Sequence, residues 1–109
     1  LEALNGPQNC VSEMNNHFKR RANLMFNRLN EIKGFSCQKP NGAFYCFPNI
    51  TGTGKNSTEI QNILLDNLGV ATVAGTSFGE YGEGYIRLSC ANSDSAIEEA
   101  ISRIKDFLN

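Results

Sequence analysis

Apolar residues follow helical spacing in three stretches of this chain and strand spacing in three short stretches between them. The helical stretches are residues 13–32, 57–68 and 95–108. The strand stretches are residues 43–47, 70–73 and 85–89. Helices that each carry one apolar stripe must bury it against another layer. The order αβαββα therefore predicts a small α/β domain with α+β character, in which helices pack on a short mixed or antiparallel sheet.

Capping residues support two of the helix boundaries. Asn56 with Glu59 three residues later, or Ser57 alone, can cap the second helix. Ser95 with Glu98 has the spacing of a capping box for the third helix. Both patterns satisfy N–H groups that have no partner inside the helix.

The strand stretches differ in their side-chain patterns. Residues 43–47 are apolar and aromatic on both faces, which predicts a strand covered on both sides. In residues 85–89, Ile86 and Leu88 point to one face of the strand. Tyr85, Arg87 and Ser89 point to the other face.

Length and composition favour one folded domain spanning residues 1–109. The hydrophobic share is 40% and the charged share 19%, which is typical of globular proteins. The formal net charge of −1 argues against a surface that neutralises phosphates, so we expect no nucleic-acid partner. No apolar run approaches the ~20 residues that span a bilayer, so we expect no membrane partner.

The cysteines and the single histidine do not form a metal motif. Cys10, Cys37, Cys46 and Cys90 contain no C-x-x-C pair, and His17 lies near none of them except Cys10. We expect four reduced thiols packed as small hydrophobes in a cytoplasmic protein, and no metal site. His17 is expected to be a solvated helix residue.

Arg87 is the residue with the most distinctive setting. It lies in a strand between two apolar residues, directly after a loop that contains Gly82 and Gly84. A guanidinium group presents a planar fork that binds a carboxylate through two parallel hydrogen bonds, and the glycines leave room for a ligand. Three interpretations remain open: Arg87 binds an external carboxylate, it pairs with an Asp or Glu of this chain, or it simply lies on an open face of the sheet.

Several runs of this sequence resemble the class I and II aminotransferases. They are 42–48 (GAFYCFP), 69–79 (GVATVAGTSFG) and 82–89 (GEGYIRLS) with the following 91–93 (ANS). The opening residues 3–8 (ALNGPQ) and 18–21 (FKRR) are similar to the bacterial aspartate aminotransferase branch in particular. The resemblance covers essentially the whole chain.

The resemblance implies a C-terminal small domain of a larger, homodimeric enzyme of fold type I that depends on pyridoxal 5'-phosphate. It implies that Arg87 binds the α-carboxylate of an amino acid or 2-oxo acid substrate, with aspartate and 2-oxoglutarate as the default pair. Closure of this domain on the large domain of the same chain would bring Arg87 to the substrate and expel water.

The catalytic lysine of the family is expected outside this chain. None of the lysines has the family's sequence setting, and they are Lys19, Lys33, Lys39, Lys55 and Lys105. We therefore expect neither catalytic nor cofactor-binding residues in this fragment, no cofactor bound to it, and no activity from it alone. The chain opens without Met on residues typical of a helix end, which favours a piece of a longer protein.

Two alternatives remain beside the aminotransferase. A small domain with an internal arginine is also compatible with a regulatory module that binds an amino acid. Other pyridoxal-phosphate enzymes of the same fold, such as a β-lyase or a decarboxylating synthase, share the carboxylate-binding arginine.

Overall fold

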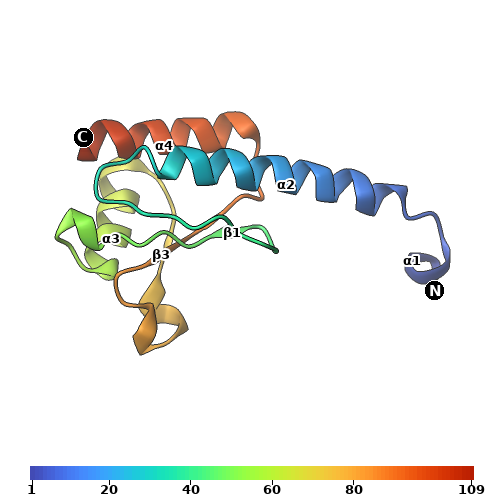
Figure 1. The fold of residues 1–109 in the computed structure, drawn as a ribbon, viewed down its shortest axis with the longest axis horizontal. Helices are drawn as coiled ribbons and strands as arrows, with labels where there is room; N and C mark the ends of the chain where they lie inside the picture. Colours follow the sequence, from blue (N-terminus) through green and yellow to red (C-terminus); the bar gives the residue numbers. More distant parts are fainter.

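The computed structural model describes all 109 residues and has the expected order of elements (Figure 1). Its helices and strands are α1 (Glu2–Asn5), α2 (Asn9–Leu29), β1 (Tyr45–Cys46), α3 (Ser57–Leu68), β2 (Val73–Ala74), β3 (Ile86–Ser89) and α4 (Asp94–Leu108). Short 3₁₀ turns lie at 51–53, 75–78 and 80–82. Apart from the four-residue α1, the order αβαββα is confirmed. No helix combines the length and apolar character that crossing a membrane requires.

The three strands form one antiparallel sheet in the order β1-β3-β2. Of the two arrangements left open by the sequence, the antiparallel one is correct. The register places Val73 opposite Arg87 and Cys46 opposite Leu88. Side chains alternate along β3 as predicted, with Ile86 and Leu88 buried and Arg87 half-buried.

Helices α2, α3 and α4 pack on the buried side of the sheet and enclose the core. The largest fully buried apolar side chains are Leu29, Ile32, Ile50, Ile60, Leu64, Ile86 and Ile104. The opposite side of the sheet is open, because Phe47, which follows the buried Cys46 on the other face, is 41% exposed. The prediction that residues 43–47 are covered on both sides is therefore wrong for this chain, since its helices cover one side only.

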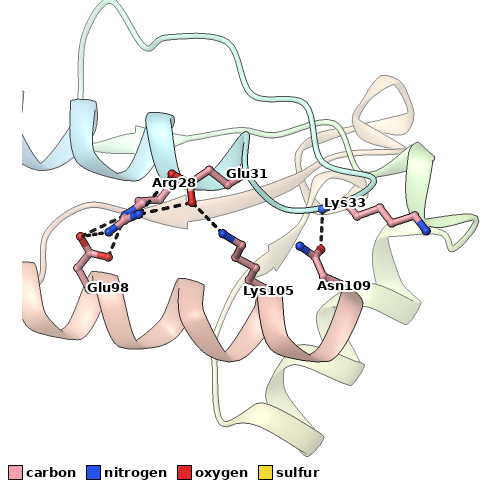
Figure 2. Close-up of polar contacts among 6 residues, drawn as sticks. All are labelled: Arg28, Glu31, Lys33, Glu98, Lys105 and Asn109. Carbon is pink, nitrogen blue, oxygen red and sulfur yellow. Dashed lines mark hydrogen bonds and ion pairs between the residues drawn. The ribbon is translucent and has the colours of Figure 1, made fainter.

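Helices α2 and α4 lie side by side and run in the same direction (Figure 1), and charged side chains join their outer surfaces (Figure 2). Arg28 Nε lies 3.1 Å from Glu98 Oε2, and Arg28 also bonds Glu31. Lys105 Nζ lies 3.0 Å from Glu31 Oε2, and this contact is the main cause that lowers the pKa of Glu31. The four groups link the two helices in one exposed network.

Two further contacts fix the register of this helix pair at its ends. Asp94, at the start of α4, accepts hydrogen bonds from Arg21 and Arg20, which lower the pKa of its carboxyl group. At the other end the backbone N–H of Lys33 donates to Asn109 Oδ1 at 2.9 Å (Figure 2). The N-terminal turns of α2 extend beyond α4 and lie exposed (Figure 1).

Two helix boundaries differ from the sequence prediction. Helix α2 ends at Leu29 instead of residue 32, because the Asn30 side chain forms hydrogen bonds with backbone groups at this point. Asn30 Nδ2 donates to the carbonyls of Phe26 and Cys37, and its Oδ1 accepts the Cys37 N–H. An asparagine side chain that bonds backbone groups in this way competes with helix continuation.

The start of α4 is capped by Ser93, whose hydroxyl accepts the Ala96 N–H at 3.2 Å. The predicted capping box of Ser95 and Glu98 does not form. Glu98 points to Arg28 of α2 instead, because that cation offers a charged partner across the helix pair.

The capping box of Asn56 and Glu59 forms as the first of the two alternatives predicted, with both reciprocal bonds present. Helix α3 ends at Gly69, whose φ of 66° is left-handed. The Val70 N–H still donates to the carbonyl of Leu64, so residue 70 belongs to the helix end. The strand predicted at 70–73 is therefore wrong in its bounds, and β2 is Val73–Ala74.

The cysteines are all free thiols, and three of them are buried. Cys46 Sγ lies 3.9 Å from Cys90 Sγ in the core, and the neighbouring thiols together with burial raise the pKa of Cys46. Cys10 is exposed on α2, so the prediction that it packs as a small hydrophobe is wrong. It lies in the part of α2 that no other element covers. His17 is exposed on α2, as predicted.

Candidate functional site

Arg87 lies on the open side of the sheet, in the central strand. Both neighbours pair with β3, so the backbone beneath this side chain is bonded on both sides. A side chain on such a strand is positioned more rigidly than one on a loop. The alternation that buries Ile86 and Leu88 directs Arg87 away from the helices.

Aromatic rings hold the guanidinium group from two directions. The Cζ atom of Arg87 lies 4.3 Å from the centre of the Tyr45 ring and 4.7 Å from the centre of the Phe78 ring. Phe47 stacks on Tyr85 at 5.1 Å and meets Phe78 edge-on at 6.3 Å. Rings at these distances attract a cation without using its N–H donors.

No carboxylate of this chain pairs with Arg87. The ion pairs all lie on α2, the turn after it, and α4. The interpretation in which Arg87 pairs with an internal Asp or Glu is therefore wrong, whereas its position on an open face of the sheet agrees with the structure. Its fork of N–H donors remains available to a carboxylate from outside the chain.

A cavity of about 580 Å³ opens beside the aromatic rings and is lined by polar and aromatic side chains from three segments. Its aromatic lining residues are Tyr45, Phe47 and Tyr85, and its polar ones include Lys39 and Asn49. It adjoins Arg87 through the shared Tyr45 ring.

A second cavity of about 300 Å³ lies against α4 and the end of α3. Its arginine, Arg103, already donates to the carbonyl of Leu68 and to Glu99, so it offers no comparable free fork. No cluster of three or more His, Cys, Asp or Glu side chains is arranged to hold a metal ion.

The sequence indicated Arg87 but not the residues that surround it. Tyr45 and Phe78 lie 42 and 9 positions before it, and only the strand pairing and the loop geometry bring their rings to the guanidinium. The strand pattern of 43–47 contained a usable signal, since an antiparallel partner places every second residue on the Arg87 side. Nothing in the sequence pattern indicated Phe78.

The chain is similar to known proteins over nearly all of its length. The family model described as aminotransferase class I and II matches residues 1–104. An aspartate aminotransferase from Pyrococcus horikoshii is 39% identical over 99% of this chain and 28% of its own length. An aromatic-amino-acid aminotransferase from Thermococcus litoralis is 43% identical over 91% of this chain and 25% of its own length.

Solved structures agree with these sequence relatives. An alanine aminotransferase from Pyrococcus furiosus superimposes with a TM-score of 0.93 at 39% identity, over 98% of this chain and 28% of that one. The chain thus spans roughly a quarter of the length of the proteins it matches.

Proposed function

The chain belongs to the class I and II aminotransferases, and on that premise we propose that it is the small C-terminal domain of such an enzyme, with Arg87 binding the substrate α-carboxylate. The observation that carries this proposal is the guanidinium group itself. It lies on the open side of the sheet between two rings, and no Asp or Glu of the chain neutralises it. A free fork of donors on a rigid strand suits an incoming carboxylate.

In the proposed reaction an amino group passes between an amino acid and a 2-oxo acid, both of which carry a carboxylate next to the reacting carbon. Two parallel hydrogen bonds from Arg87 would fix the direction of the substrate and so orient its reacting carbon. We propose aspartate and 2-oxoglutarate as the substrate pair. Relatives named for aspartate, aromatic amino acids and alanine all match this domain, so its side-chain selectivity is set largely elsewhere.

Aminotransferases of this family use pyridoxal 5'-phosphate, and no lysine of this chain is enclosed in a way that suits binding it. The cofactor requires an enclosed lysine amine. Lys19, Lys33, Lys39 and Lys55 are exposed, and Lys105 is paired with Glu31. We therefore propose that the cofactor is held by a large domain of the same protein and that this chain alone is inactive. We further propose a cytoplasmic homodimer.

The test is Arg87→Ala in the full-length protein that carries this chain. Loss of a charged two-bond contact is expected to lower kcat/KM by the equivalent of about 3 kcal/mol. Arg103→Ala is the matched control, because it removes an arginine that is exposed and engaged with Leu68 and Glu99. Unchanged kcat/KM in Arg87→Ala would remove this residue from the reaction.

A titration of the isolated chain with aspartate or 2-oxoglutarate distinguishes a regulatory amino-acid-binding module from a domain of a larger enzyme. A domain that binds amino acids by itself would take up aspartate or 2-oxoglutarate below millimolar concentration. A domain of a larger enzyme lacks the rest of the site and is expected not to bind them in that range.

A further inference from the structure

Glu83 is an exposed residue of the loop between the 3₁₀ turn at 80–82 and β3, and its carboxylate reaches the start of another element. Oε1 accepts the backbone N–H of Ser57 at 2.9 Å, and Oε2 accepts the Ser57 hydroxyl at 2.8 Å. Ser57 is the first residue of α3. One carboxylate therefore ties the loop to the N-terminus of this helix through two bonds.

The Glu83 carboxylate accepts an N–H group that the capping box leaves without a partner. Asn56 accepts the Glu59 N–H, and Glu59 accepts the Asn56 N–H, so neither takes the N–H of Ser57. Ser57 is fully buried, and a buried hydroxyl requires a hydrogen-bond partner. The two hydrogen bonds from Ser57 favour the ionised form of the Glu83 carboxylate, and so does the positive end of the α3 dipole. The pKa of Glu83 is lowered accordingly.

The loop held in this way carries one of the two rings at Arg87. Phe78 lies on the loop five residues before Glu83, and its side chain is 55% exposed, so the core does not fix it. The loop folds back on itself where Gly75 and Gly82 approach so closely that a Cβ on either would collide with the backbone of the other. Glu83 follows this contact directly and joins the folded loop to α3.

We propose that Glu83 is a positioning residue for substrate carboxylate binding: by bonding the N-terminus of α3 at Ser57, it holds the loop that places Phe78 against Arg87. This inference rests on the function proposed above. A ring over a guanidinium limits the plane of that group, so displacement of Phe78 frees the fork to swing away from the direction in which it meets a carboxylate.

The experiment compares Glu83→Ala, Glu83→Gln and Ser57→Ala in the full-length protein. Glu80→Gln is the matched control, because Glu80 is an exposed carboxylate of the same loop and its side chain makes no hydrogen bond or ion pair. Three quantities are measured: KM and kcat for the amino acid, and the dissociation constant of maleate, a dicarboxylate that does not react. Thermal unfolding of each variant is recorded in parallel.

Glu83→Ala is expected to raise KM and the maleate dissociation constant by roughly tenfold while kcat changes by less than about twofold. Glu83→Gln is expected to fall between wild type and Glu83→Ala, because the amide keeps one acceptor but not the charge. Ser57→Ala removes the hydroxyl bond alone and is expected to have a similar intermediate effect. Glu80→Gln is expected to match the wild type.

Each other outcome overturns the inference. A Glu83→Ala protein that melts earlier but binds maleate as tightly as wild type would make Glu83 a structural anchor only. If Glu83→Ala does not fold, wild-type binding in both Glu83→Gln and Ser57→Ala would equally reduce Glu83 to a structural anchor. A wild-type protein that neither binds maleate nor transfers amino groups overturns the proposed function as well, whereas unchanged binding in the variants overturns this inference alone.

Discussion

The two sides of the three-stranded sheet contain different kinds of residue, although they share the same backbone. On one side Ile86 and Leu88 of β3 are buried beneath three helices. On the other side Arg87 is half-buried and lies against two aromatic rings, although it is only one position away from Ile86 and Leu88. The covered side supplies stability through buried apolar area, and the open side supplies a charged group with free donors. Substitutions on the two sides should therefore affect different measurements.

Replacing the fully buried Ile86 gives the largest expected effect on stability. Ile86→Ala removes buried methyl groups and leaves a cavity, so the free energy of unfolding should fall by about 2–5 kcal/mol. Denaturant unfolding measures this loss. Arg87→Ala is the comparison from the open side and should cost at most about 1–2 kcal/mol, the value of its two ring contacts. Equal losses at the two positions would contradict the division between the two sides.

Arg87→Lys separates charge from shape on the open side. Lysine keeps the positive charge but cannot form two parallel hydrogen bonds with a carboxylate. In the full-length protein we expect kcat/KM to fall by the equivalent of about 1–3 kcal/mol, which is less than for Arg87→Ala. Steady-state kinetics with aspartate measures it. Full activity in Arg87→Lys would mean that a point charge suffices.

Acid should weaken the contacts that three exposed carboxylates make with α2, α3 and α4. The pKa values of Asp94, Glu31 and Glu83 are lowered in the fold, by Arg21, Lys105 and Ser57 respectively. A lowered pKa means that the stabilisation is complete above the unfolded-state values of 3.8 and 4.5 and is lost as pH falls through the folded-state values. We expect Tm to be flat near neutral pH and to drop below about pH 4.5. Asp94→Asn should show a shallower drop, and parallel curves would exclude Asp94 as a source.

The smallest expected effect on stability belongs to Cys10. It is exposed on the part of α2 that extends past α4, whereas Cys37, Cys46 and Cys90 are buried. Cys10→Ser should leave Tm unchanged, and iodoacetamide should label Cys10 first in the native protein. Mass spectrometry of digested protein identifies the labelled site. Equal labelling of Cys46 would show that the covered side of the sheet is open to reagent.

The sequence was sufficient to predict the order of elements, the alternation in β3 and the capping box at Asn56, because all three depend on local spacing. It was insufficient for the end of α2 and the start of α4. There Asn30 bonds the distant Cys37 backbone, and Glu98 pairs with Arg28 of another helix. A local capping rule does not include partners that only the folded chain brings close.

The candidate site divides in the same way. Arg87 stood out because a charged residue inside a strand next to glycines is uncommon. The rings of Tyr45 and Phe78 and the bond from Ser57 to Glu83 depend on tertiary placement. The alternation in residues 43–47 was a partial signal for Tyr45, and the sequence pattern did not indicate the others. A group with an unusual local setting can be found from sequence, while the residues that orient it require coordinates.

The central place of β3 has a consequence for motion. A strand bonded on both edges exchanges its amide hydrogens only when the neighbouring strands separate, which in a sheet this small amounts to global unfolding. The segment bearing Arg87 should therefore be among the last to exchange in deuterated solvent, while the turns at 75–82 exchange early. Any conformational change on ligand binding would then occur in the segments around Arg87, such as the turns at 75–82, while the backbone of β3 stays in place.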